Sequence, residues 1–160
     1  MDRLDECLKR PYLLLTPGPL STSEGVRTAM LKDWCTWDKD YNNLVEEIRK
    51  ELVALCVKPE NREKYTSVLM QGSGSFGVES VLGTAIPKKN AKLLVLANGA
   101  YGNRMGEIAS ILGINYRIEK FGDKNPVTPE RVREILKEDF EITHVSVVHS
   151  ETTSGILNPV

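Results

Sequence analysis

Four consecutive apolar residues, Leu93-Leu94-Val95-Leu96, place the strongest constraint on how this chain can fold. Successive side chains of a β-strand point to opposite faces of the sheet, so a strand of this composition must be covered on both faces. Other short apolar runs alternate along the chain with segments of helical periodicity. The pattern predicts an α/β domain with a mostly parallel sheet covered by helices, in three layers.

The spacing of apolar residues also predicts the order of the elements. We expect strands at 66–70, 92–97, 116–121 and 144–149, and helices at 76–85, 104–112 and from Thr128 onward. Earlier in the chain, a capping sequence predicts a short helix near Ser23, and an apolar stripe predicts an amphipathic helix over 41–57 with Cys56 buried at its end. We divide the chain into an extended arm, residues 1–22, and a domain, residues 23–160.

The charge balance argues against a polyanionic partner. The chain has 160 residues with 21 basic and 22 acidic side chains, and its longest basic run is Lys88-Lys89. We therefore expect no nucleic acid partner. No apolar run approaches membrane-spanning length, and the first residues lack a secretory pattern, so we expect no membrane association and a cytoplasmic location. The three cysteines are widely spaced, which predicts no metal site.

The sharpest local feature is Gly72-Ser73-Gly74-Ser75-Phe76-Gly77, which follows one predicted strand and opens the next helix. Small residues allow a ligand to approach the backbone closely, and free amides at the start of a helix favour an anion. The hydroxyls of Ser73 and Ser75 add further donors. The segment predicts a phosphate-binding loop, and a tight turn without a ligand is the alternative.

The same residues match the G-x-G-x-x-G pattern of dinucleotide-binding folds. That class requires an acidic residue at the end of the next strand, where this chain has Asn98. A P-loop is excluded because no Lys-Ser or Lys-Thr pair follows the glycines. The phosphate of a different kind of ligand is therefore the preferred hypothesis.

Two further segments follow strands, and we expect them at the same edge of the sheet. Asn98 to Arg104 contains Tyr101, whose ring could stack on a flat ligand, although a tyrosine that only packs in a turn is an equal alternative. His149 to Gly155 carries several hydroxyls that can donate to a ligand. His149 itself has no acid and nucleophile as partners, so we reject a hydrolase triad.

Together, these motifs and their order resemble the class V branch of fold-type I pyridoxal-phosphate (PLP) enzymes. Their residues are most similar to those of 2-aminoethylphosphonate:pyruvate transaminases. The resemblance spans nearly the whole chain and is carried by four segments: Leu15 to Leu20, Cys35 to Tyr41, Met70 to Phe76, and Glu151 to Gly155. It implies the amino-terminal part of a PLP-transferase large domain, PLP as cofactor, and a homodimer.

The resemblance also implies roles for individual residues. Ser73, Gly74 and Ser75 are expected to hold the PLP phosphate. Tyr101 is expected to stack on the cofactor ring, and Thr152 to donate to its phenolic oxygen. The residues expected near the substrate entrance are Pro17, Gly18, Pro19 and Trp37. The implied reaction moves an amino group from 2-aminoethylphosphonate to pyruvate, giving phosphonoacetaldehyde and L-alanine.

In the family, the lysine that forms the Schiff base and the aspartate that pairs with the pyridine nitrogen follow the Glu-Thr-Thr segment. The resemblance therefore implies that both lie after Val160, and we expect no catalytic residue within the chain and no activity from the chain alone. Two alternatives stay open. One is another class V transaminase, such as one acting on alanine and glyoxylate, and the other is a non-catalytic module that binds a phosphate ligand or dimerises.

Overall fold

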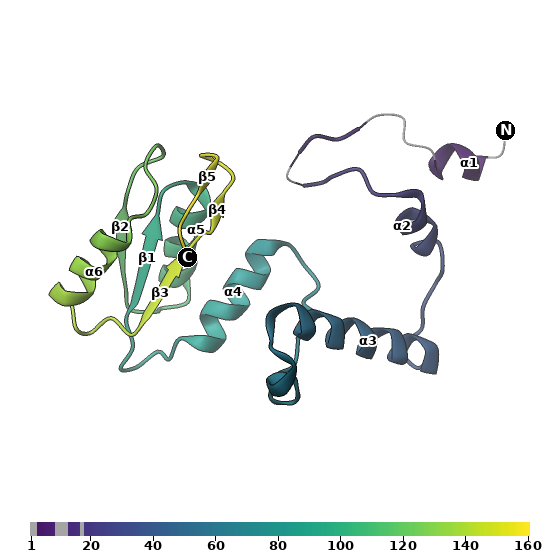
Figure 1. Cartoon of the computed structure of the whole chain (residues 1–160), viewed down its shortest axis with the longest axis horizontal. Coiled ribbons are helices and arrows are strands. Elements are labelled where there is room, and N and C mark those ends of the chain that lie inside the picture. The colour runs from purple at the N-terminus through teal and green to yellow at the C-terminus, as the bar shows by residue number, and fades with distance from the viewer. Residues whose placement is uncertain (1–2, 9–12, 17) are drawn as a thin grey trace. The chain divides into compact units, whose positions relative to one another are not determined.

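The computed structural model describes residues 3–8, 13–16 and 18–160 of the chain. These residues divide into two units, Met1–Leu69 and Met70–Val160, which we call unit 1 and unit 2 and describe separately (Figure 1). Unit 1 contains the helices α1 (Arg3–Leu8), α2 (Glu24–Ala29) and α3 (Lys39–Cys56), followed by the 3-10 helix η1 (Pro59–Lys64). No helix of the described residues combines the length and the apolar character that crossing a membrane requires.

The helices α2 and α3 confirm two predictions from the sequence. Ser23 is the N-cap of α2, and its hydroxyl oxygen accepts a hydrogen bond from the Val26 amide at 3.3 Å. The expected amphipathic helix is α3, but its apolar stripe is only half covered, with Leu52 39% exposed. Cys56, which we expected to be buried at the end of this stripe, is exposed. That prediction is wrong because α3 has no buried residue at all.

Unit 2 contains the predicted parallel sheet. Its strands are β1 (Leu93–Ala97), β2 (Tyr116–Lys120) and β3 (His144–Val147), arranged in the order β2-β1-β3. Both outer strands run parallel to β1, with Leu93 opposite Tyr116 on one side and opposite His144 on the other. Every residue of β1 is buried, as its apolar composition predicts. A short antiparallel hairpin, β4 (Ser150–Glu151) and β5 (Ile156–Leu157), follows β3.

Helices cover the sheet on both faces, which confirms the predicted α/β class. Alternate residues of β1 supply two separate cores. Leu93 and Val95 pack against α4 (Gly74–Ala85) and α5 (Ala100–Ile111), whereas Leu94 and Leu96 pack against α6 (Pro129–Glu138). Figure 1 shows these layers, with α6 in green on one side of the strands and α5 on the other.

One predicted strand is absent. Residues 66–70 are irregular, although their sequence predicted a strand next to the glycine-rich loop. A strand requires a neighbouring strand as hydrogen-bond partner, and no strand of the described residues pairs with this segment. The segment bonds to α3 instead. The Arg49 guanidinium donates to the Ser67 carbonyl at 2.9 Å, and the Ser67 hydroxyl donates to the Arg49 carbonyl at 3.1 Å.

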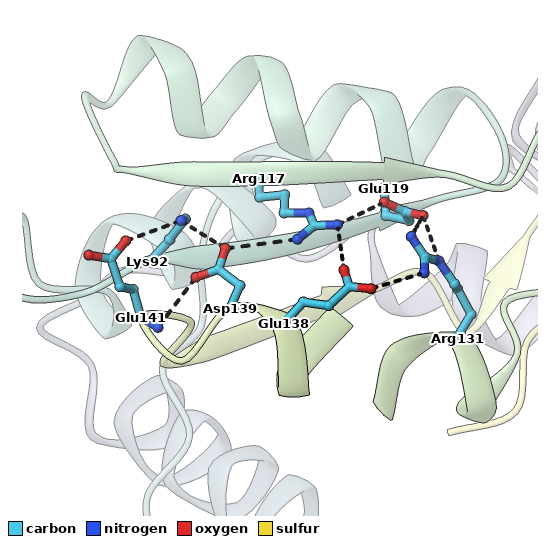
Figure 2. Close-up of polar contacts among 7 residues, drawn as sticks. All are labelled: Lys92, Arg117, Glu119, Arg131, Glu138, Asp139 and Glu141. Carbon is cyan, nitrogen blue, oxygen red and sulfur yellow. Dashed lines mark hydrogen bonds and ion pairs between the residues drawn. The ribbon is translucent and has the colours of Figure 1, made fainter. Parts of the chain in front are cut away.

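A network of ion pairs joins α6 and the loop after it to β1 and β2 (Figure 2). Lys92, just before β1, lies 2.8 Å from Asp139, and Arg131 of α6 lies 2.9 Å from Glu119 of β2. The Lys92 ammonium lowers the pKa of Asp139, and the Asp139 carboxylate raises the pKa of Lys92. The other members are Arg117, Glu138 and Glu141. Because partly exposed pairs contribute little stability, we expect the buried apolar core, and not this network, to supply most of the free energy that holds α6 to the sheet.

Ile135 should be the most sensitive position of α6. Its side chain is completely buried, so Ile135→Ala removes core contacts and should lower the free energy of unfolding by about 2–5 kcal/mol. The neighbouring Leu136 is 36% exposed and supplies a control of the same size, so Leu136→Ala should cost clearly less. Urea unfolding followed by circular dichroism measures both. Equal losses for the two variants would contradict the two-faced burial of the sheet.

Candidate functional site

The predicted site residues of unit 2 follow strand ends or open helices at the carboxyl edge of the sheet. β1 continues through Asn98 and Gly99 directly into α5, and β3 leads into the β4–β5 hairpin. α4 runs in the direction opposite to β1, so the beginning of this helix also lies toward this edge (Figure 1). In parallel α/β sheets this edge is where ligands bind. The glycine-rich loop, Tyr101 and Thr152 therefore belong to the same end of unit 2.

The glycine-rich loop makes a sharp entry into α4. Ser73 is the N-cap in an extended conformation, and its carbonyl accepts hydrogen bonds from the amides of Phe76 and Gly77 at 3.0 and 3.2 Å. A Cβ atom at Gly72 would lie 2.5 Å from Cδ1 of Phe76, so only glycine fits there. The sequence thus fixes the direction in which the first amides of α4 point.

These first amides are free to bind an anion. Within the described part of the chain, the Gly74 and Ser75 amides have no hydrogen-bond acceptor, and the Ser73 hydroxyl does not cap the helix. The first turn of α4 carries no acidic residue, and a Cβ atom at Gly74 would meet nothing within 4 Å. Two open amides, two serine hydroxyls and the positive end of a helix form a donor set that fits a phosphate group.

The start of α5 is different, because a buried carboxylate already occupies it. Glu151 of β4 has no exposed surface. One of its oxygens accepts from the Gly102 amide at 3.0 Å, and the other accepts from the Thr153 hydroxyl at 2.6 Å and, over a longer distance, from the Tyr101 amide at 3.5 Å. Glu151 therefore caps α5 from a neighbouring loop and holds the hairpin against it.

Two opposing effects act on the pKa of Glu151. Burial raises it, because loss of water disfavours the charged carboxylate. The hydrogen bonds from the Thr153 hydroxyl and from the Gly102 and Tyr101 amides lower it and outweigh burial, so that the pKa lies below its ordinary value. The positive end of α5 favours the charged form as well. Glu151 is therefore an ionised carboxylate held by neutral donors.

A pair of buried amide side chains fixes the other end of the hairpin. Asn98, after β1, and Asn158, after β5, exchange two hydrogen bonds of 2.9 and 3.0 Å. Asn158 also donates to the Val148 carbonyl at 2.7 Å and accepts from the Val127 amide at 2.9 Å. The pair therefore joins the ends of β1 and β3 to the loop that precedes α6.

Tyr101 and Thr152 lie on the two segments that Glu151 connects. Tyr101 is in the first turn of α5 and is half exposed, and Thr152 is exposed in the turn between β4 and β5. Neither side chain is buried in the core, so both are accessible to a ligand at this edge. His149, in contrast, contacts the end of the hairpin through its backbone carbonyl, which accepts a hydrogen bond from the backbone amide of Asn158 at 2.6 Å.

The predicted substrate-entrance residues lie in unit 1. Gly18, Pro19 and Trp37 are exposed, Trp37 to 92% of its surface, whereas Pro17 lies outside the described residues. The Thr16 hydroxyl donates a hydrogen bond to the Pro19 carbonyl and shapes this extended segment. The entrance role of these residues stays a prediction.

Three residues of the site were not predicted from the sequence. Glu151, Asn98 and Asn158 stood inside or beside the motifs, but their burial depends on contacts between residues 27 to 60 positions apart. The only sequence feature that pointed toward such a buried polar residue was its place directly after an apolar strand. Among the described residues, no group of three or more His, Cys, Asp or Glu side chains is placed to hold a metal ion.

Comparison with solved structures places the fold among the aminotransferases. Pyridoxamine-pyruvate aminotransferase from Mesorhizobium loti matches with a TM-score of 0.80 and 27% identity, over 94% of this chain and 37% of that one. Ureidoglycine-glyoxylate aminotransferase from Bacillus subtilis matches with a TM-score of 0.79 and 22% identity, over 94% of this chain and 38% of that one. The chain thus resembles in fold a part of these aminotransferases.

Sequence comparison identifies the particular relatives. The 2-aminoethylphosphonate–pyruvate transaminase of Phocaeicola vulgatus is 58% identical over 152 residues, which are 94% of this chain and 41% of the relative. The corresponding enzyme of Bacillus cereus is 54% identical over 93% of this chain and 40% of its own length. A bifunctional phosphonoacetaldehyde hydrolase/aminoethylphosphonate transaminase of Clostridioides difficile is 56% identical over 93% of this chain and 23% of its own length.

The resemblance seen in the motifs is therefore confirmed over nearly the whole chain. The chain spans about 40% of the length of the first two relatives. No family model matches it.

Glu151 should make the stability of unit 2 depend on pH in the acidic range. Because its folded pKa is lowered, its contribution is complete above the unfolded value of about 4.3 and is lost as the pH falls through the folded pKa. At about pH 7, Glu151→Gln should lower the free energy of unfolding by about 1–3 kcal/mol. The gap between wild type and variant should shrink below about pH 4.

Urea unfolding at a series of pH values measures this gap. Glu107→Gln, on the exposed face of α5, is the control and should differ little from wild type at any pH. A gap for Glu151→Gln that stays constant down to about pH 3 would contradict a stabilising charged carboxylate.

Proposed function

We propose that the protein containing this chain is a PLP-dependent 2-aminoethylphosphonate:pyruvate transaminase and that this chain supplies much of its cofactor site. The observation that carries the proposal is 58% identity to such an enzyme over 94% of the chain, together with an open phosphate loop at the start of α4. The reaction converts 2-aminoethylphosphonate and pyruvate into phosphonoacetaldehyde and L-alanine. When bound, PLP serves as the electron sink of amino transfer.

Different residues of the chain bind different parts of the cofactor. The Gly74 and Ser75 amides, with the hydroxyls of Ser73 and Ser75, hold the phosphate group of the cofactor. Tyr101, half exposed at the start of α5, supplies an aromatic face for the cofactor ring. The exposed hydroxyl of Thr152 donates a hydrogen bond to the phenolic oxygen of the ring. Anchoring the phosphate at one point and the ring at two others orients the cofactor.

The remaining parts of the proposal follow the resemblance seen in the motifs. Gly18 and Pro19, together with the exposed Trp37, line the entrance for substrate in a cytoplasmic homodimer. An exposed tryptophan is suited to such a place because aromatic residues are enriched at binding surfaces. These residues act on access and not on the chemistry.

The phosphate loop makes a specific prediction about cofactor binding. The double variant Ser73→Ala/Ser75→Ala removes two hydroxyl donors and should weaken PLP binding by about a hundredfold or more, because each hydrogen bond to a charged group contributes about 1.5–3 kcal/mol. Titration followed by PLP absorbance measures the affinity. Pyridoxal, which lacks the phosphate, should bind wild type and variant equally weakly. The control Ser110→Ala, on the exposed side of α5, should bind PLP as wild type does.

The activity itself is testable in a fusion. This chain, joined in frame to the carboxyl-terminal remainder of the Phocaeicola vulgatus relative, should form L-alanine from 2-aminoethylphosphonate and pyruvate. Thr152→Val should reduce the rate in the fusion by about tenfold, through the lost hydrogen bond, while Thr152→Ser should restore it. Alanine production is measured with a coupled dehydrogenase. A fusion that binds PLP but prefers alanine and glyoxylate would replace the proposed substrates with those of another transaminase.

A further inference from the structure

Glu151 is a buried carboxylate whose charge is balanced without a cation. Among the described residues, its hydrogen-bond donors are all neutral groups: the Gly102 and Tyr101 amides and the amide and hydroxyl of Thr153. Burying a charge is costly, and a buried ion whose partners are lost costs more still. The hydrogen bonds from these donors therefore have to offset the cost of burying the Glu151 carboxylate.

Those donors belong to the two segments that carry Tyr101 and Thr152. The Tyr101 and Gly102 amides begin α5, whereas Glu151 and Thr153 flank Thr152 in the hairpin. A second path runs in parallel, since the Thr153 hydroxyl donates to Glu151 at 2.6 Å and accepts from the Ala100 amide at 3.0 Å. Movement of the hairpin relative to α5 would break both paths at once.

The packing around the carboxylate is close. A Cβ atom at Gly99 would lie 2.4 Å from Cγ of Glu151 and 2.7 Å from the Thr153 hydroxyl oxygen. A Cβ atom at Gly102 would lie 2.7 Å from Cα of Ala97. Two glycines thus allow the start of α5 to approach Glu151 on one side and β1 on the other. The position of the first turn of α5 is set between them.

We propose that Glu151 is a positioning residue, which fixes the Tyr101 ring and the Thr152 hydroxyl relative to each other for binding a flat, phosphate-bearing cofactor. The proposal rests on the function proposed above for Tyr101 and Thr152. Glu151 acts through the backbone of Tyr101 and through its neighbours in the hairpin, and its carboxylate does not touch the ligand. The phosphate loop lies on α4, outside this linkage, and binds independently of it.

The two parts of the cofactor allow a test. Glu151→Gln replaces one acceptor oxygen by an NH2 group that faces amide donors, so the hairpin and α5 should lose their fixed relation. PLP affinity should fall by about tenfold, and the absorption spectrum of bound PLP should change. The affinity for inorganic phosphate, measured on the same chain, should stay within about twofold of wild type. Glu107→Gln is the control and should change neither affinity.

A second pair of variants covers the case in which Glu151→Gln does not fold. Thr153 is exposed, so Thr153→Val removes the hydroxyl between Glu151 and Ala100 with little effect on the core. Thr153→Val should weaken PLP by about threefold to tenfold without affecting phosphate, and Thr153→Ser should restore wild-type affinity. Equal loss of PLP and phosphate affinity, or no loss of either, would overturn the positioning role.

A third measurement separates this proposal from the proposed function. In the ligand-free chain, amide hydrogen exchange at Tyr101 and Gly102 should be faster in Thr153→Val than in wild type and unchanged in Thr153→Ser. If wild type fails to bind PLP but this exchange pattern is found, the cofactor assignment is wrong while the positioning of Tyr101 by Glu151 stands. Protected amides in all variants would show that Glu151 and Thr153 do not position Tyr101.

Discussion

The burial of β1 on both faces is the constraint on which the rest of unit 2 depends. Leu93 and Val95 require one helical layer and Leu94 and Leu96 require another, so the chain must cross from one face to the other between parallel strands. Because the strands are parallel, their carboxyl ends lie at one edge of the sheet. The functional segments are therefore together because of core packing, before any contact between them is considered.

Contacts between the segments then set their exact positions. The Asn98–Asn158 amide pair holds the end of the hairpin to the end of β1, and Glu151 holds its beginning to α5. Both sites are buried polar groups with complete hydrogen bonding, which favours a single arrangement because any alternative leaves a donor or acceptor unpaired. These contacts hold the backbone of the two segments that carry the exposed side chains of Tyr101 and Thr152.

The sequence was sufficient for features that depend on local pattern and insufficient for those that depend on distant partners. The strand predicted at 92–97 and the helices predicted at 76–85 and from Thr128 onward follow from apolar spacing, and the structure confirms them with small shifts of their ends. Thr128 is the N-cap residue of α6, but its hydroxyl makes no capping hydrogen bond. The strand predicted at 66–70 fails because the pattern reports β-propensity and not the presence of a partner strand. Glu151 was not predicted because its role depends on hydrogen bonds from backbone amides about fifty residues away in the sequence.

The two helices that begin at the carboxyl edge differ in their capacity to bind an anion. Both helix starts offer amides and a positive dipole end. At α5 these amides are already occupied. The ionised carboxylate of Glu151 accepts hydrogen bonds from the Tyr101 and Gly102 amides and would repel a second anion. At α4 the Gly74 and Ser75 amides have no acceptor within the described residues, and the first turn carries no acid. This difference supports the proposal that the start of α4, and not that of α5, binds the phosphate of the cofactor.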